Sequence, residues 1–160
     1  MAAAGKTTLL LVDDHAIVRQ GLAALLAREA DFAVAGEAGT YEDGLAALAA
    51  LAPDGVVLDL SLRDRSGLDW IREARAKGYA GKILVLSMHD EAVYAEKALR
   101  AGAQVVATWR RDPTRRRGLA LLVHPLTPLP ARVTRALPAA AAAYGAFWEH
   151  NGEVAVRVDG

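Results

Sequence analysis

The chain has 160 residues, 53% of them hydrophobic, which is enough for one domain with a core and an appendage. Its 19 basic and 19 acidic residues give a formal net charge of zero, so the total charge predicts no polyanionic partner. The absence of cysteine excludes disulfides and thiolate metal sites, and no stretch approaches the roughly 20 apolar residues that span a membrane.

Short apolar runs alternate with helix-like segments from residue 7 to residue 109. We predict strands over residues 8–12, 32–37, 56–60, 83–86 and 104–108, and helices over residues 16–28, 41–51, 66–77 and 91–100. The predicted helices carry apolar residues at helical spacing, and the predicted strands are too short and too apolar for surface helices. Such alternation is typical of βαβ units, so we expect a doubly wound α/β fold with a parallel sheet.

The alternation stops after residue 109. Residues 110–160 contain five of the six prolines and eight arginines, and they carry a net charge of +4 against −4 for residues 1–109. No amphipathic helix long enough to cover the sheet is evident there, and residues 154–158 form a strand-like segment without an evident partner. We therefore expect a flexible start over residues 1–6, one domain over residues 7–109, and a poorly ordered Arg/Pro/Ala-rich tail over residues 110–160.

Polar residues stand where the predicted strands end. Asp13 and Asp14 follow the first strand, Asp59 lies near the end of the third, and Ser87 follows the fourth. In open parallel sheets, sites form beyond the carboxyl ends of the strands, so we expect these four side chains to converge. Three carboxylates suit Mg²⁺, a carboxylate at position 59 can attack phosphorus as a nucleophile, and Ser87 can donate a hydrogen bond to a phosphoryl oxygen.

Each of these residues also has a simpler interpretation. Asp14 can cap the helix that begins near residue 16, and a serine such as Ser87 at a strand end is common. His15 is interpreted as a residue at the rim of the site, because no second histidine lies at ligand spacing. Asp59 is harder to explain in this way, since a carboxylate within an apolar strand is costly unless it is paired or bound to metal.

Five motifs surround these residues: LLVDDHAIVRQGL at 10–22, DGVVLDLS at 54–61, SGLD at 66–69, ILVLSM at 83–88 and AGA at 101–103. Together they resemble the receiver domains of NarL/FixJ-like (LuxR-type) response regulators over about residues 7–104. The resemblance implies a flavodoxin-like (CheY-like) five-stranded fold. It also implies a cytoplasmic signalling switch in transcription regulation that a histidine kinase phosphorylates on Asp59. Mg²⁺ would be held by Asp13, Asp14, Asp59 and the backbone carbonyl of Ser61.

The sequence departs from this family after residue 104. The lysine that the family carries at the end of the fifth strand falls at Trp109, and the aromatic residue expected three positions earlier is Val106. Arg110 and Arg111 are not at the right spacing to substitute, and arginine does not mimic lysine well. The fifth helix and the helix-turn-helix output domain are not recognisable. A frameshift product and a genuine divergent tail both remain open, and the coding DNA would decide between them.

Four functions are compared. A phosphorylatable receiver, which is not a turnover enzyme, agrees best with the motifs. A phosphorylation-impaired pseudo-receiver or interaction module is the alternative that Trp109 and Val106 favour. An aspartyl-phosphate phosphatase is disfavoured, because such enzymes usually need a second carboxylate at the position of Ser61. Sequence-specific DNA binding by this chain alone is not expected, a membrane partner is not expected, and a homodimer is left open.

Overall fold

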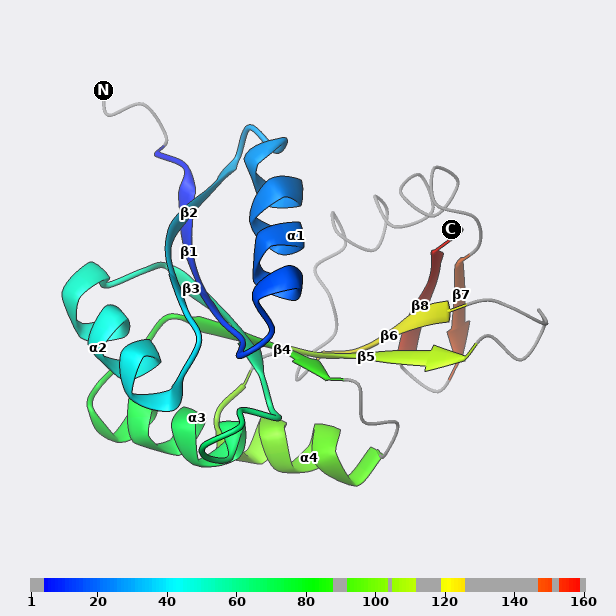
Figure 1. Cartoon of the computed structure of the whole chain (residues 1–160). Coiled ribbons are helices and arrows are strands. Elements are labelled where there is room, and N and C mark those ends of the chain that lie inside the picture. Colours follow the sequence, from blue (N-terminus) through cyan, green and yellow to red (C-terminus); the bar gives the residue numbers. More distant parts are fainter. Residues whose placement is uncertain are drawn as a thin grey trace.

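A computed structural model describes residues 5–87, 92–103, 105–111, 119–125, 147–150 and 153–158. For Ser87, for residues 92, 93 and 95, and for every strand after residue 104, it describes the backbone alone. In chain order the elements are β1 (Thr7–Val12), α1 (Ala16–Ala27), β2 (Phe32–Ala38), α2 (Tyr41–Leu51), β3 (Gly55–Asp59), α3 (Gly67–Ala76), β4 (Lys82–Ser87), α4 (Ala92–Ala101), β5 (Val105–Arg111), β6 (Leu119–Pro125), β7 (Phe147–His150) and β8 (Glu153–Val158). Figure 1 shows this arrangement.

The strands form one sheet in the order β2-β1-β3-β4-β5-β6-β8-β7. Strands β1 to β5 pair in parallel, which confirms the predicted doubly wound α/β fold. The strand order reverses beside β1 and β3, where the register sets Val12 opposite Leu58. The residues that follow this pair, Asp13 and Asp59, are therefore neighbours at the carboxyl edge of the sheet, where sites form in this class of fold.

The sheet continues past β5 through three antiparallel strands. β6 pairs with β5, β8 pairs with β6, and β7 pairs with β8. The strand-like segment for which the sequence shows no partner therefore has two, because β8 lies between β6 and β7. β5 also runs to Arg111, beyond the expected domain boundary at residue 109. No helix follows α4 among the described residues, and the rest of the expected tail lies outside them.

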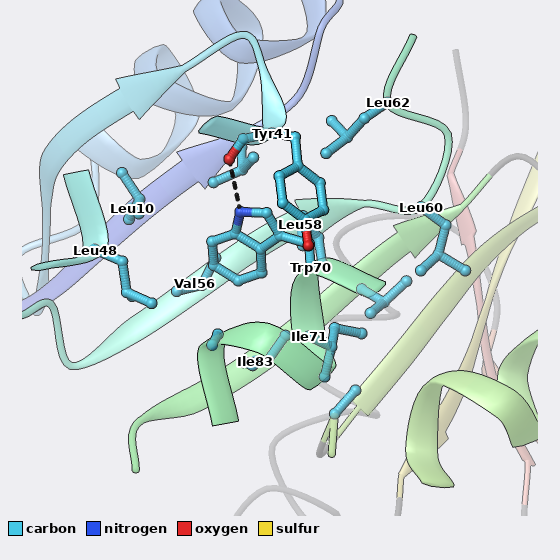
Figure 2. Packing of buried hydrophobic residues seen from close by; sticks show 14 of the residues in the cluster. Leu10, Tyr41, Leu48, Val56, Leu58, Leu60, Leu62, Trp70, Ile71 and Ile83 are labelled. Atoms are coloured by element: carbon cyan, nitrogen blue, oxygen red, sulfur yellow. Dashed lines mark hydrogen bonds between the residues drawn. The ribbon is translucent and has the colours of Figure 1, made fainter. Parts of the chain in front are cut away.

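The main core lies between one face of the sheet and helices α2, α3 and α4. Alternate residues of β1, β3 and β4 point into it, as the two-residue side-chain period of a strand requires: Leu10, Val12, Val56, Leu58, Ile83 and Val85. Trp70 of α3 is fully buried there and donates a hydrogen bond of 3.2 Å from Nε1 to the carbonyl oxygen of Tyr41, which is the dashed contact in Figure 2. The buried indole N–H is thus satisfied, and it links α3 to the start of α2.

Helix α1 lies on the other side of the sheet from α2 and α3 (Figure 1). It has no buried residue, and Ile17, Val18 and Leu25 are 85%, 42% and 61% exposed. Without a recognisable fifth helix, the sequence predicts that one face of the sheet stays partly uncovered. The exposed apolar residues belong to α1 and not to the sheet, so that expectation stays a prediction.

The loop between β3 and α3, which follows Asp59, is held at two points. Gly67 starts α3 and donates its backbone N–H to the carbonyl of Leu60 at 2.9 Å. The chain passes so close there that a Cβ atom on Gly67 would lie 2.6 Å from Cα of Leu60. Earlier in the loop, the Asp64 carboxylate accepts the backbone N–H of Tyr41 at 3.3 Å, at the start of α2. These contacts fix the backbone that follows Asp59.

Candidate functional site

Three carboxylates meet at the carboxyl edge of the sheet. Asp13 and Asp14 follow β1, Asp59 ends β3, and one ligand atom from each lies within 4.8 Å of the others and of a His15 nitrogen. The sequence predicts this convergence for the three aspartates, and the structure shows it. Ser87 ends β4 one residue beyond Leu86, the partner of Asp59 in the ladder. Its side chain lies outside the described residues, so its hydrogen bond to a phosphoryl group stays a prediction.

Asp59 is held by the backbone of the loop that follows it. The N–H of Ser61 donates a hydrogen bond of 3.0 Å to Oδ1 of Asp59, and the Asp59 side chain is 12% exposed. Burial raises the pKa of the Asp59 carboxyl, and the nearby charges of Asp13 and Asp14 raise it further, although the Ser61 N–H and His15 oppose the shift. A negative charge at this position is therefore disfavoured until a cation compensates it.

His15 contacts the carboxylates from the exposed rim of the site. Its Nδ1 is 3.0 Å from Oδ1 of Asp13, 3.0 Å from Oδ1 of Asp14 and 3.6 Å from Oδ2 of Asp59. The hydrogen bond to Asp13 and the charge of Asp14 raise the pKa of His15. Its side chain is 56% exposed, and its contacts with the aspartates are ones that the spacing between histidines cannot predict.

Asp14 does not cap α1, so the capping interpretation of this residue is wrong. The N-cap of α1 is His15, and no side chain makes a cap hydrogen bond there. The Asp14 side chain is 6% exposed, and its Oδ1 has no hydrogen-bond partner among the described residues, although His15 lies near it. A nearly buried carboxylate oxygen that accepts no hydrogen bond is an unsatisfied position, and a bound cation would satisfy it.

Two arginines that the sequence analysis did not select also contact the site. The guanidinium of Arg19 in α1 donates a hydrogen bond to the backbone carbonyl of Asp13, and its Nε lies 3.8 Å from Glu37. The Nε of Arg63, in the loop after β3, lies 3.3 Å from Oδ2 of Asp14. No sequence signal could have selected them, because both are ordinary surface cations until the fold brings them to the aspartates.

The donor set suits a hard divalent cation. Asp13, Asp14 and Asp59 offer carboxylate oxygens at one point, and Mg²⁺ prefers such ligands while it keeps several waters. The unsatisfied Oδ1 of Asp14 and the raised pKa of Asp59 both favour a bound cation at this point. The predicted contribution of the Ser61 carbonyl stays a prediction.

The family model for the response regulator receiver domain matches residues 9–108. The chain therefore belongs to the response regulator receiver family, as the motifs indicated. It is 35% identical over 96 residues to the nitrate/nitrite response regulator protein NarL of Escherichia coli, covering 60% of this chain and 44% of NarL. It is 40% identical over 106 residues to the transcriptional regulatory protein UhpA of Salmonella typhimurium, covering 66% of this chain and 53% of UhpA. The chain thus spans about half the length of these relatives.

Solved receiver structures have the same fold. A two-component response regulator of the LuxR family from Aurantimonas is 30% identical, with a TM-score of 0.62 and coverage of 87% of each chain. The signal receiver domain of the putative response regulator NarL from Mycobacterium tuberculosis is 28% identical, with a TM-score of 0.60, and the match covers 62% of this chain and 81% of that one. Position 109, where the family lysine is expected, lies on β5, and the side chains of Val106 and Trp109 lie outside the described residues.

Proposed function

We propose that Asp59 accepts a phosphoryl group from a histidine kinase, and that the domain thereby acts as a signalling switch in transcription regulation. The observation that carries this proposal is the position of Asp59 beside Asp13 and Asp14 at the switch in strand order, in a chain of the receiver family. The domain would assist its own phosphorylation on Asp59, as a substrate of the kinase and not as a turnover enzyme.

The residues of the site support this chemistry. The Ser61 N–H holds Oδ1 of Asp59, which leaves Oδ2 on the side of the cluster. In the reaction, an oxygen of Asp59 forms a bond to phosphorus, the phosphorus–nitrogen bond of phosphohistidine breaks, and its electron pair returns to the imidazole nitrogen. Asp13, Asp14, Asp59 and the Ser61 carbonyl would hold Mg²⁺, which would neutralise phosphoryl oxygens. Ser87 would donate a hydrogen bond to one of them.

The partner and the location follow from the same proposal. A histidine kinase is the phosphodonor, and the cytoplasm is the compartment in which the two would meet. Among the described residues, no helix has the length and apolar character to span a bilayer. We propose no sequence-specific DNA binding by this chain alone, and a homodimer stays an open alternative.

A pseudo-receiver is the second candidate. Trp109 at the lysine position favours it, because a lysine ammonium there would bind phosphoryl oxygen and link phosphorylation to the movement of β4. Such a domain would keep the fold without the switch, so its affinity for partners and its oligomeric state would not change on phosphorylation. A comparison of partner affinity before and after phosphorylation therefore separates the two candidates.

Labelling with a small phosphodonor tests the proposed function. With phosphoramidate and Mg²⁺, intact-protein mass spectrometry should show one added phosphoryl group on the wild type and none on Asp59→Asn. Asp69→Asn is the matched control, because it removes one carboxylate from the exposed surface of α3. It should be labelled like the wild type. Equal labelling of Asp59→Asn and wild type would show that Asp59 is not the acceptor.

A further inference from the structure

An arginine at the edge of the acidic cluster has no place in the predicted site. Arg63 belongs to the loop between β3 and α3, and its Nε lies 3.3 Å from Oδ2 of Asp14. The Arg63 side chain is 82% exposed, whereas that of Asp14 is 6% exposed. A nearly buried carboxylate is thus paired with a side chain that solvent surrounds on most of its surface.

The other arginines near the cluster are engaged with different groups, whereas His15 contacts the cluster itself. Arg19 donates to the Asp13 carbonyl and faces Glu37. Arg65, two positions further along the loop, lies 3.8 Å above the ring of Tyr41 and pairs with Glu42 at 3.3 Å. Among the described residues, Arg63 contacts Asp14 of the cluster. Arg63 is therefore the exposed arginine that is placed to respond to a change of charge at the site.

Phosphorylation would make such a change. An aspartyl phosphate would bring about two negative charges next to the carboxylates of Asp13 and Asp14, and one Mg²⁺ compensates only part of them. The residue at the lysine position is Trp109, so β5 supplies no ammonium group there. A guanidinium offers several N–H donors in a planar fork that matches phosphoryl oxygens, and a hydrogen bond of this kind is strengthened by charge.

We propose that Arg63 changes partners during phosphorylation: it neutralises Asp14 in the metal-free protein, and it donates hydrogen bonds to the phosphoryl oxygens once Mg²⁺ engages Asp14. This inference rests on the proposed function of Asp59. With phosphoramidate as donor, an Asp59 oxygen forms the new bond to phosphorus, the phosphorus–nitrogen bond breaks, and ammonia leaves with the electron pair. Arg63 would stabilise the charge on the transferring group without exchanging a proton.

Two measurements on Arg63→Met test the proposed change of partners. The contact with Asp14 and the contact with the phosphoryl group predict effects in opposite directions. Loss of the cation that competes for Asp14 should tighten Mg²⁺ binding, measured calorimetrically with the metal alone, by about two- to fivefold, the range of an exposed ion pair. Loss of the phosphoryl contact should slow labelling by phosphoramidate at saturating Mg²⁺ by roughly tenfold. Arg63→Lys should recover part of the labelling rate, because it keeps the charge but not the planar fork.

The controls separate this inference from the proposed function. Arg72→Met removes the same charge from the exposed surface of α3, where Arg72 pairs with Asp69 at 3.0 Å, and it should match the wild type in both measurements. If the wild type is labelled and Arg63→Met is labelled at the same rate, the phosphoryl contact is wrong while the proposed function stands. If the Mg²⁺ affinity of Arg63→Met is unchanged, the exchange of partners is wrong. A wild type that takes no label overturns both.

Discussion

The backbone N–H of Ser61 donates a hydrogen bond of 3.0 Å to Oδ1 of Asp59. This contact ties the carboxylate at the end of β3 to the first residues of the loop that follows. The other oxygen, Oδ2, lies 3.6 Å from Nδ1 of His15. One oxygen of Asp59 is thus held by the backbone, while the other belongs to the cluster. A carboxylate that is oriented in this way is suited to act as a nucleophile. Because the carboxylate is also nearly buried, its charge affects the stability of the fold.

Asp59→Asn should stabilise the metal-free protein at neutral pH. Burial raises the pKa of Asp59 above its usual value of 3.8, so the contribution of this group to stability is full below that value and is lost as the pH rises through the folded-state pKa. At neutral pH the charge is therefore a cost, and its removal should raise the free energy of unfolding by roughly 0.5–2 kcal/mol. Urea unfolding in the presence of EDTA would measure this. A less stable variant would contradict the assignment of Asp59 as an uncompensated charge.

Gly67→Ala should destabilise the domain and disturb the loop after Asp59. A Cβ atom there would lie 2.6 Å from Cα of Leu60 and 2.8 Å from the Asp59 carbonyl oxygen, and both neighbours are backbone atoms that cannot rotate away. We expect the free energy of unfolding to fall by roughly 1–3 kcal/mol, the usual effect of overpacking. Gly21→Ala is the control, since nothing lies within 4 Å of its new methyl group. Because Gly21 is in helix α1, this substitution should raise the free energy of unfolding by up to about 1 kcal/mol. Equal melting temperatures for the two variants would refute the close approach at Gly67.

The raised pKa of Tyr41 predicts that the protein loses stability at high pH. The ring is fully buried, and burial together with the 2.5 Å hydrogen bond to Glu73 raises the pKa of Tyr41 from 10.0 to about 12. The stability from this shift is complete below pH 10 and is lost as the pH rises from 10 through 12, by roughly 2–3 kcal/mol. Tyr41→Phe should lack this contribution and fall less steeply over the same range. Parallel stability curves for the two proteins would exclude Tyr41 as the titrating group.

The apolar side of α1 should promote self-association without contributing to stability. Ile17 and Leu25 are 85% and 61% exposed, so Ile17→Ser and Leu25→Ser should change the free energy of unfolding by less than about 0.5 kcal/mol. By contrast, Leu58→Ala, at a fully buried position, should lower the free energy of unfolding by roughly 2–5 kcal/mol. Light scattering should show less association for the two serine variants. If they unfold as readily as Leu58→Ala, α1 is packed against a partner.

Sequence patterns predicted the parallel part of the fold because its signals are local. The apolar runs around Leu10, Val56 and Ile83 and the helical spacing between them located β1 to β4 and α1 to α4 within a few residues. The position of the aspartates followed from one rule of topology, since Val12 and Leu58 are partners in the ladder. The family match later confirmed the class of protein that the motifs indicated.

The remaining features depend on contacts that a local pattern does not encode. The partners of β8 are β6 and β7, and the pairing of Val123 with Val154 joins segments separated by a long stretch of chain. His15 contacts the cluster because its backbone is extended at φ −85° and ψ 105°, which a count of histidine spacings cannot predict. Arg63 reaches Asp14 only through the path of the loop after Asp59.

The central claim is tested most directly by locating the phosphoryl group. Protein labelled with phosphoramidate and Mg²⁺ can be reduced with borohydride, which converts a phosphorylated aspartate into homoserine, and then digested and sequenced by mass spectrometry. We predict homoserine at position 59, dependent on Mg²⁺ and absent from protein treated with EDTA. A phosphoryl group found at another residue, or labelling that is equal in EDTA, would contradict the metal-assisted acceptor described above.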